Sequence, residues 1–332
     1  MLKQSQQELW REYDLAILDL DGVVYIGPDA VPGVAGHLEA AASAGMHLAF
    51  VTNNAARPPR AVAEHLTSLG VPAAAEDVVT SAQAAARLLS AQLEPGAPVF
   101  VIGGPGLEEA LAEQGLRAVS STDDDPVAVV SGYYADLRWR TVSEGAILVK
   151  KGLPWVASNT DFAVPTAQGH GPGNGVLVQA VASFSGRTPV VAGKPLVPLF
   201  EETRLRVGGE RPLVIGDRLN TDIEGANNAG LDSLLVLTGV TGVKELVTAP
   251  LDQRPTYIAP TLAGLGQRHL VPERRDGAYE LGGWRAVAEH GEVKVEGEGD
   301  SGDWWRVLAS AAWAHLDETG QSVDVSGVEA PM

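Results

Sequence analysis

The feature that most constrains the fold is a repeated pattern of short apolar segments that each end at polar residues or glycine. These segments lie at residues 15–18, 47–51, 190–193, 212–215 and 233–237. Short runs that are apolar throughout are typical of parallel strands buried on both faces of a sheet. Apolar residues at helical spacing follow the first two segments, at 33–45 and 59–69. This alternation predicts an α/β fold, a parallel sheet with helices on both sides.

Two further parts are predicted beside this sheet. A second α/β pattern, with apolar segments at 98–102, 128–130 and 155–157, interrupts the first one. After residue 260, we expect a hairpin of 279–289 and 292–298, a helix at 303–318, and a last strand at 322–326. One stripe of this helix is apolar, with Trp305, Leu308, Ala312 and Leu316. The predicted domains are therefore a core of 1–78 plus 188–260, an inserted domain of 79–187, and a small α+β domain of 261–332.

Polar side chains follow four of the predicted strands directly. They are Asp19 and Asp21, Thr52 to Asn54, Lys194, and Asp217 with Asp222. Open parallel sheets bind ligands beyond the carboxyl ends of their strands. Each signal alone is weak, because Asp-x-Asp is most often a surface turn and Thr-Asn-Asn a helix cap. Their joint order along the chain predicts a site for phosphoryl transfer.

The acidic residues suit a covalent mechanism on a phosphate ester. Asp19 is ionised at neutral pH and can attack phosphorus to form an aspartyl-phosphate. Asp21 points the same way along an extended segment, so it can protonate the leaving group and then deprotonate water, which requires a raised pKa. Mg²⁺ would offset the repulsion between carboxylates and phosphate, held by Asp19, the backbone carbonyl of Asp21, and Asp217. We expect Asp222 to support these ligands without binding the ion.

The other polar residues at the strand ends suit binding of the phosphate itself. Lys194 supplies a second positive charge, as a catalytic and a phosphate-binding residue. The Thr52 hydroxyl and the amides near Asn53 and Asn54 can bind non-bridging oxygens. Such groups stabilise the charge of the transition state, which is most of what phosphoryl transfer needs.

Composition limits the partners. The 332-residue chain has a net charge of −18 and no cysteine. Its negative field repels nucleic acid and anionic membranes, so neither is expected as a partner. The field also repels phosphate esters, so a phosphate site must supply its own positive charge. Without cysteine there are no disulfides and no thiol catalysis. No segment looks like a signal peptide or a membrane span, so a soluble, cytoplasmic protein is expected.

These motifs resemble those of the haloacid dehalogenase superfamily of phosphatases. The matching segments are Asp19-Leu20-Asp21-Gly22-Val23, Thr52-Asn53, Lys194-Pro195, and Gly216 to Ile223. The resemblance covers residues 14–260 and implies a Rossmann-like core, Mg²⁺ as the cofactor and a phosphorylated metabolite as the substrate. The superfamily's dehalogenases lack an aspartate matching Asp21, and its cation pumps have threonine there.

The position of the insertion is similar to that in one branch of the superfamily. The chain between Asp19 and Thr52 is too short for an inserted domain, whereas the chain between Thr52 and Lys194 is long enough. This placement resembles the C2 cap of the NagD-like, 4-nitrophenylphosphatase and phosphoglycolate phosphatase group. The segments Ser158 to Asp161 and Pro172 to Gly175 resemble sequence motifs of that group. A domain of this size over the site favours small, enclosed substrates.

The C-terminal domain resembles the acetyltransferase-like appendage of the bacterial glycerol-3-phosphate phosphatases, which implies glycerol 3-phosphate as the substrate. Phosphoglycolate, 4-nitrophenyl phosphate and nucleotides stay open as alternative substrates, and a non-catalytic sugar-phosphate-binding regulator as an alternative function. A phosphomutase is less expected, because mutases of the superfamily usually carry the other cap type. No convincing pyrophosphate-binding loop is found, so we expect a packing or dimerisation module, which leaves a homodimer open.

Two features of the inserted domain have simpler explanations than function. Gly171 to Gly175 has the wrong spacing for a dinucleotide fingerprint, and no strand is predicted before it, so we interpret it as a turn. His170, beside it, is the one histidine that we consider for substrate contact, although a surface role is favoured. Trp304, Trp305 and Trp313 are interpreted as core residues.

Overall fold

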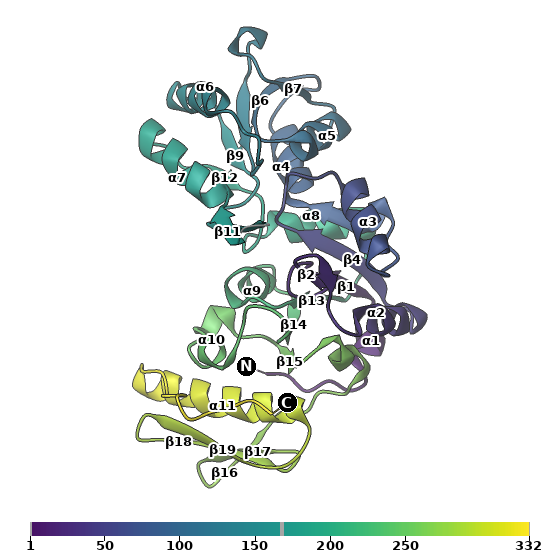
Figure 1. The fold of residues 1–332 in the computed structure, drawn as a ribbon, viewed down its shortest axis with the longest axis vertical. Helices are drawn as coiled ribbons and strands as arrows, with labels where there is room; N and C mark the ends of the chain where they lie inside the picture. The colour runs from purple at the N-terminus through teal and green to yellow at the C-terminus, as the bar shows by residue number, and fades with distance from the viewer. Residues whose placement is uncertain (1, 167–168, 332) are drawn as a thin grey trace. The chain divides into compact units, whose positions relative to one another are not determined.

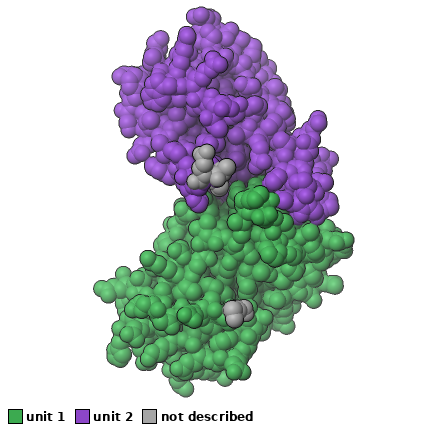
Figure 2. Space-filling model, in the orientation of Figure 1, with its two compact units in different colours: residues 1–48, 209–332 green, residues 49–208 purple. Residues whose placement is uncertain are grey.

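The computed structural model describes residues 2–166 and 169–331, and the chain forms two compact units (Figures 1 and 2). Unit 1 comprises residues 1–48 and 209–332, and unit 2 comprises residues 49–208. The three domains expected from the sequence stay a prediction. Among the described residues, no helix combines the length and the apolar character needed to cross a bilayer.

Unit 1 is built on a parallel sheet. Its strands, in spatial order, are β15 (Tyr257–Ala259), β14 (Asp232–Val236), β13 (Pro212–Gly216) and β1 (Leu15–Leu18). Helices α9 (Glu224–Asn228) and α10 (Val243–Val247) lie on one side, and α1 (Leu9–Glu12) and α2 (Val34–Ser43) on the other (Figure 1). Every residue of β1 and β13 is buried, as expected for strands covered on both faces. The predicted α/β fold is confirmed.

The C-terminal part of unit 1 is an antiparallel sheet under a long helix. The strands are β16 (Glu273–Arg275), β17 (Ala278–Leu281), β18 (Trp284–Glu289) and β19 (Glu292–Gly297), and the helix is α11 (Ser301–Thr319). The predicted turn at 290–291 is confirmed, but a single strand over 279–289 is wrong. Gly282 and Gly283 both have positive φ and break that strand in two. The last strand expected at 322–326 is also wrong, because only Asp324 forms a bridge there.

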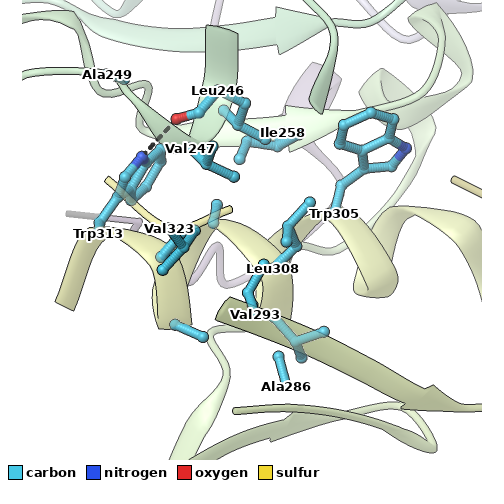
Figure 3. Packing of buried hydrophobic residues seen from close by; sticks show 14 of the residues in the cluster. Leu246, Val247, Ala249, Ile258, Ala286, Val293, Trp305, Leu308, Trp313 and Val323 are labelled. Carbon is cyan, nitrogen blue, oxygen red and sulfur yellow. Dashed lines mark hydrogen bonds between the residues drawn. The ribbon is translucent and has the colours of Figure 1, made fainter. Parts of the chain in front are cut away.

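Helix α11 is buried on two faces, so the prediction of a single apolar stripe is too narrow. One face meets Ala286 and Val293 of the antiparallel sheet, and the other packs among Leu246, Val247 and Ile258 (Figure 3). The indole Nε1 of Trp313 donates to the carbonyl of Leu246 at 2.8 Å. Trp304, Trp305 and Trp313 are all buried, which confirms their predicted place in the core. The C-terminal part therefore shares an apolar core with the rest of unit 1.

A buried polar contact lies at the start of the same helix. The Arg306 guanidinium donates to the carbonyl of Ile258 at 3.2 Å and to Nδ1 of His269 at 3.1 Å. Since Nδ1 accepts this bond, the His269 proton is on Nε2, which faces the carbonyl of Gly264 at 2.9 Å. Burial, and then the nearby charge of Arg306, lower the pKa of His269 to about 4. His269 is therefore a neutral residue of the core at physiological pH.

Unit 2 contains most of β4 (His47–Thr52), its parallel partner β5 (Val78–Thr80), and a second parallel sheet. The strands of the second sheet, in spatial order, are β12 (Val190–Val191), β9 (Trp155–Ala157), β8 (Ala128–Ser131), β6 (Pro98–Ile102) and β7 (Arg117–Val119). The helices of unit 2 are α3 (Pro59–Ser68), α4 (Ser81–Ser90), α5 (Pro105–Glu113), α6 (Trp139–Lys150), α7 (Asn174–Ser185) and α8 (Pro198–Val207). Helices α6 and α7 lie on one side of the second sheet, and α4 and α5 on the other (Figure 1).

The predicted turn at 171–175 is wrong in detail. Gly171 and Pro172 belong to strand β11 (Gly169–Pro172), which pairs with β10 (Ala163–Thr166), and Asn174 begins α7. The segment therefore joins a hairpin to a helix. His170 is an exposed residue of that hairpin.

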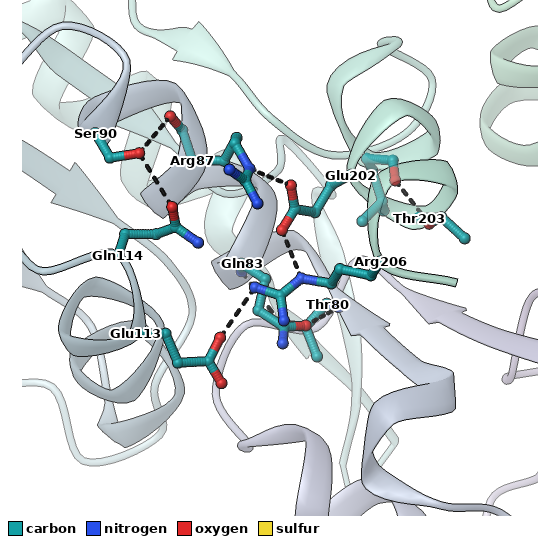
Figure 4. A network of polar contacts seen from close by, with 10 residues as sticks. Thr80, Gln83, Arg87, Ser90, Glu113, Gln114, Glu202, Thr203 and Arg206 are labelled. Atoms are coloured by element: carbon teal, nitrogen blue, oxygen red, sulfur yellow. Dashed lines mark hydrogen bonds and ion pairs between the residues drawn. The ribbon is translucent and has the colours of Figure 1, made fainter. Parts of the chain in front are cut away.

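A charged cluster links helices of unit 2. Glu202 of α8 is 1% exposed, and its carboxylate accepts from Nε of Arg87 at 2.6 Å and from Nε of Arg206 at 2.5 Å (Figure 4). Arg206 also donates to Glu113 of α5 at 2.9 Å. Because Glu202 is buried between two guanidinium groups, its charge is compensated.

Candidate active site

Three carboxylates of unit 1 form a cluster at the ends of two neighbouring strands. Asp19 follows β1 and Asp217 follows β13, and these strands pair in parallel with Leu18 opposite Ile215. The amide of Asp19 donates to the carbonyl of Ile215 at 2.9 Å, which continues the ladder to the end of the strand. One carboxylate oxygen from each of Asp19, Asp217 and Asp222 lies within 4.8 Å of the others. The structure thus brings together the three acidic residues that the strand ends predict.

Two glycines leave room for the Asp217 side chain. Gly22 has φ +83°, which disfavours other residues, and a Cβ there would overlap the Asp217 carboxylate. A Cβ at Gly239 would overlap the same carboxylate from another loop. The amide of Val240 donates to Oδ2 of Asp217 at 2.6 Å. Asp217 is fully buried, and backbone groups determine where its oxygens lie.

Asp222 is held by the turn that joins it to Asp217. Residues Leu219–Ile223 form a π-helical turn, a local geometry that is frequent at functional sites. Oδ2 of Asp222 accepts from the amide of Arg218 at 3.2 Å and from the Thr221 hydroxyl at 3.4 Å. The Asp222 side chain is 1% exposed. Its hydrogen bonds stabilise the loop that carries Asp217.

The donor set fits a hard divalent cation. Carboxylates this close repel one another, and a cation among them offsets the repulsion. Oxygen-only ligands are those that Mg²⁺ and Ca²⁺ prefer. Asp19 is partly exposed, whereas Asp217 and Asp222 are buried, so the cluster is open on the side of Asp19. The residues present are therefore suited to Mg²⁺.

Asp21 lies just beyond this cluster and is exposed. Its backbone bridges to Tyr25, and the next amide, of Gly22, donates to the carbonyl of Tyr25 at 2.8 Å. The Thr238 hydroxyl donates to the carbonyl of Gly22, which ties this turn to the loop after β14. The backbone around Asp21 is thus fixed, while its side chain reaches solvent.

In unit 2, the residues after β4 form a tight loop. Thr52 is buried, and its Oγ1 accepts the amide of Asn54 at 3.1 Å. The side-chain oxygen of Asn54 accepts the amide of Ala56 at 2.9 Å, so it shapes the loop. A hydroxyl and backbone amides are therefore the groups of this loop that suit phosphate oxygens.

Lys194 is 4% exposed and is held by the side chain of Asn53. Oδ1 of Asn53 accepts the Lys194 amide at 2.8 Å, and Nδ2 donates to the Lys194 carbonyl at 3.0 Å. A Cβ at Gly193 would lie 2.6 Å from Oδ1 of Asn53, so glycine is needed for this close approach. The side-chain amide of Asn53 is thus bonded to the Lys194 backbone.

The sequence did not point to three residues that hold the backbone and side chain of Asn53. Ser81 and Asn159 both donate to the backbone carbonyl of Asn53, and Asp161 accepts from Asn53 Nδ2 at 3.1 Å. The motif Ser158 to Asp161 pointed to the subfamily, but it did not predict that Asn159 and Asp161 bond Asn53. Gly239, in unit 1, has no sequence signal for its contact with Asp217.

Two family models match separate parts of this chain. A model described as haloacid dehalogenase-like hydrolase matches residues 16–117, and a second HAD-hydrolase-like model matches residues 191–265. The matched segments include both parts of the chain that carry the predicted motifs.

Proteins of stated activity are similar over three quarters of this chain or more. The D-glycerol 3-phosphate phosphatase of Mycobacterium tuberculosis is 42% identical over 91% of this chain and 86% of its own length. The 5′-nucleotidase YutF of Bacillus subtilis is 34% identical over 76% of this chain and 97% of its own. A crystal structure of a glycerol phosphate phosphatase from M. tuberculosis in complex with magnesium has a TM-score of 0.85, is 41% identical in sequence, and covers 93% of both chains.

Proposed function

Because the chain belongs to the haloacid dehalogenase-like hydrolases, we propose that it is a magnesium-dependent phosphatase of small phosphate monoesters, with glycerol 3-phosphate as the preferred substrate. The carboxylate cluster of Asp19, Asp217 and Asp222 at the strand ends carries this proposal. It offers a nucleophile beside the ligands for a hard cation, which is the arrangement that phosphoryl transfer from an ester requires.

In the proposed reaction, hydrolysis is split into two displacements. An Asp19 carboxylate oxygen forms a bond to phosphorus while the ester P–O bond breaks, and Asp21 gives its proton to the leaving alkoxide. Asp21 then removes a proton from water, whose oxygen attacks the phosphorus of the aspartyl-phosphate. The bond from phosphorus to Asp19 breaks, inorganic phosphate leaves, and both aspartates return to their starting state.

Positive charge and hydrogen-bond donors complete the proposal. Mg²⁺, when bound by Asp19, Asp217 and the backbone carbonyl of Asp21, supplies charge that neutralises the phosphate, and Asp222 supports these ligands. The Lys194 ammonium pairs with a non-bridging oxygen of the phosphate. The Thr52 hydroxyl and amides of the loop at Asn53 and Asn54 bind the other oxygens. The net charge of −18 makes this local compensation necessary.

The substrate follows from the relatives and not from a residue that contacts glycerol. The relative with 42% identity acts on D-glycerol 3-phosphate, and the similarity extends over most of the chain. The similarity to a 5′-nucleotidase keeps nucleotides as the second choice. We further propose a core of 1–78 plus 188–260, a C2 cap of 79–187, and an acetyltransferase-like C-terminal domain of 261–332. We propose a cytoplasmic enzyme that acts without nucleic acid or membrane; a homodimer stays open.

Phosphate release tests the proposal. Purified protein is incubated with glycerol 3-phosphate, a nucleoside monophosphate, phosphoglycolate and 4-nitrophenyl phosphate, each with Mg²⁺ and with excess chelator. We expect Mg²⁺-dependent turnover of all four, with the highest kcat/KM for glycerol 3-phosphate. No Mg²⁺-dependent turnover of any ester would disprove the phosphatase. A higher kcat/KM for the nucleotide would keep the phosphatase and change its substrate.

A further inference from the structure

Asn53 joins three segments of unit 2 that are far apart in the sequence. They are the loop after β4, the segment 158–161 after β9, and the loop of Lys194 after β12. The side-chain amide bonds both the N–H and the C=O of Lys194, and Nδ2 also donates to Asp161 at 3.1 Å. Because both backbone groups of Lys194 are bonded to one side chain, a shift of Asn53 moves Lys194 with it.

The backbone of Asn53 is held as firmly as its side chain. Its carbonyl accepts from the Ser81 hydroxyl and from Nδ2 of Asn159, the second bond being 2.6 Å long. A trans peptide is planar, so fixing this carbonyl also fixes the N–H of Asn54, which points the opposite way. That N–H lies 3.1 Å from Oγ1 of Thr52. Ser81 and Asn159 therefore set the direction of the loop that we propose to bind phosphate.

Asn159 is itself locked in place. Its side chain is buried, and its Oδ1 accepts the amide of Asp161 at 3.1 Å. Its backbone carbonyl accepts from Nδ2 of Asn174, at the start of α7, at 2.6 Å. A Cβ at Gly175 would overlap the carbonyl of Thr160, so α7 packs directly on this segment. The contacts run from α7 through Asn159 to Asn53, and from Asn53 to Lys194.

We propose that Asn159 is a positioning residue, through which the inserted segment sets the place of Lys194 and of the Thr52 to Asn54 loop. This inference rests on the phosphatase function proposed above. It gives the segment Ser158 to Asp161 a part in catalysis beyond enclosing the substrate. Asn159 acts through Asn53 and does not contact the phosphate. Its loss should weaken phosphate binding and turnover and leave the Mg²⁺ requirement as it is.

The test compares Asn159→Ala with Ser131→Ala. Ser131 is a buried residue of β8, and its hydroxyl accepts from Nε1 of Trp155 at 3.0 Å. This control therefore also loses a buried hydrogen bond, but none to Asn53. Calorimetry gives the Kd of inorganic phosphate, kinetics give kcat and KM, and urea unfolding gives the stability. For Asn159→Ala we expect a phosphate Kd raised roughly tenfold and kcat/KM lowered roughly 10- to 100-fold, the size typical of a small misplacement. For Ser131→Ala we expect both within about twofold of the wild type at a similar loss of stability, because its hydroxyl bonds Trp155 and not the loop at Asn53.

Ser81→Ala removes the other donor to the Asn53 carbonyl. If Asn159→Ala does not fold, this variant tests whether the bonds to that carbonyl position the phosphate-binding residues. We expect a phosphate Kd raised roughly threefold to tenfold, because one of two bonds remains. The inference is overturned if Asn159→Ala, or Ser81→Ala in its place, binds phosphate as tightly as Ser131→Ala. If the wild type hydrolyses no ester, the proposed function fails separately, and the phosphate Kd still decides the positioning role.

Discussion

The two groups of candidate site residues are held in place by different means. In unit 1, backbone groups position Asp217: the amide of Val240 bonds its carboxylate, and the missing side chains of Gly22 and Gly239 leave it room. In unit 2, side-chain amides position Lys194. The Asn53 side chain bonds the backbone of Lys194, and the Asn159 side chain bonds the backbone of Asn53. The acidic group, which is Asp19, Asp217 and Asp222, thus depends on the backbone at the strand ends. The basic group, which is Lys194 with the loop of Thr52 to Asn54, depends on side-chain contacts between distant segments.

This difference predicts that the two groups fail differently. A hard ion needs ligands at fixed distances, and a rigid backbone provides them. A lysine on a long side chain tolerates more adjustment, so its anchoring can be shared among several hydrogen bonds. Damage to the acidic group should sharply lower metal affinity, turnover or both. Damage to the basic group should weaken phosphate binding by degrees and spare the metal.

The largest effect is expected for Asp19→Asn, which breaks the acidic group at its nucleophile. A carboxamide oxygen does not form a stable bond to phosphorus, so turnover should fall by roughly 10⁴-fold or more, as when other catalytic groups are removed. Steady-state phosphate release measures this, with Asp29→Asn, an exposed change in the same unit, as the control. An Asp19→Asn enzyme with turnover near that of the control would remove Asp19 as the nucleophile.

The next largest effect is expected for Gly239→Ala, which fills the space beside Asp217. The new methyl group overlaps the carboxylate, so Asp217 must move. We expect the affinity for Mg²⁺ to fall roughly 100-fold, the upper range for disturbing the support of a metal ligand. Mg²⁺ titration of phosphatase activity and calorimetry with Mg²⁺ alone measure it.

The control for this change is Gly36→Ala, in helix α2, where a Cβ meets nothing within 4 Å. It should leave Mg²⁺ affinity unchanged and stabilise the helix by up to ~1 kcal/mol. If Gly239→Ala binds Mg²⁺ like Gly36→Ala, the backbone around Asp217 is not what holds the metal ligands.

A smaller effect of another kind is expected for Gly193→Ala, in the basic group. The added Cβ would lie 2.6 Å from Oδ1 of Asn53 and from the carbonyl of Ser158, so the Lys194 loop must shift. We expect the Kd of inorganic phosphate to rise roughly tenfold through this small misplacement. Mg²⁺ affinity should stay at the Gly36→Ala value. Equal losses of phosphate and Mg²⁺ affinity in calorimetry would contradict the contrast between the two groups.

Sequence reasoning succeeded where the periodicity of strands decides position. Asp19 and Asp217 each follow a buried strand, and parallel neighbours end at one edge of a sheet, so their proximity could be inferred from the sequence. The helix at 303–318 was also found, because its apolar pattern is long. The burial of this helix on two faces could not be predicted, because that requires knowing where the antiparallel sheet that covers the second face lies.

The parts that were missed depend on tertiary contacts between single side chains. The bond from Asn159 to Asn53 joins residues from distant segments, and no local pattern marks an asparagine that will donate to a backbone carbonyl. The break of the strand over 279–289 is different, because Gly282-Gly283 was visible as a signal. Two consecutive glycines favour a turn over a continuous strand, and giving them more weight would have found β17 and β18.

The last expected effect concerns stability and not ligand binding, and it extends the comparison to buried charges outside the site. In unit 2, Glu202 lies between two arginines, whereas in unit 1 His269 lies against the cation Arg306 (Figure 4 shows the former). The pKa of His269 is about 4, below its ordinary value, so its contribution to stability is complete above pH 6.5 and is lost as the pH falls toward 4. At pH 5 the loss should be about 2 kcal/mol. Urea unfolding followed by tryptophan fluorescence measures it, since most tryptophans belong to unit 1. His269→Gln should remove this pH dependence, and an unchanged loss between pH 7.5 and pH 5 in that variant would assign it to other groups.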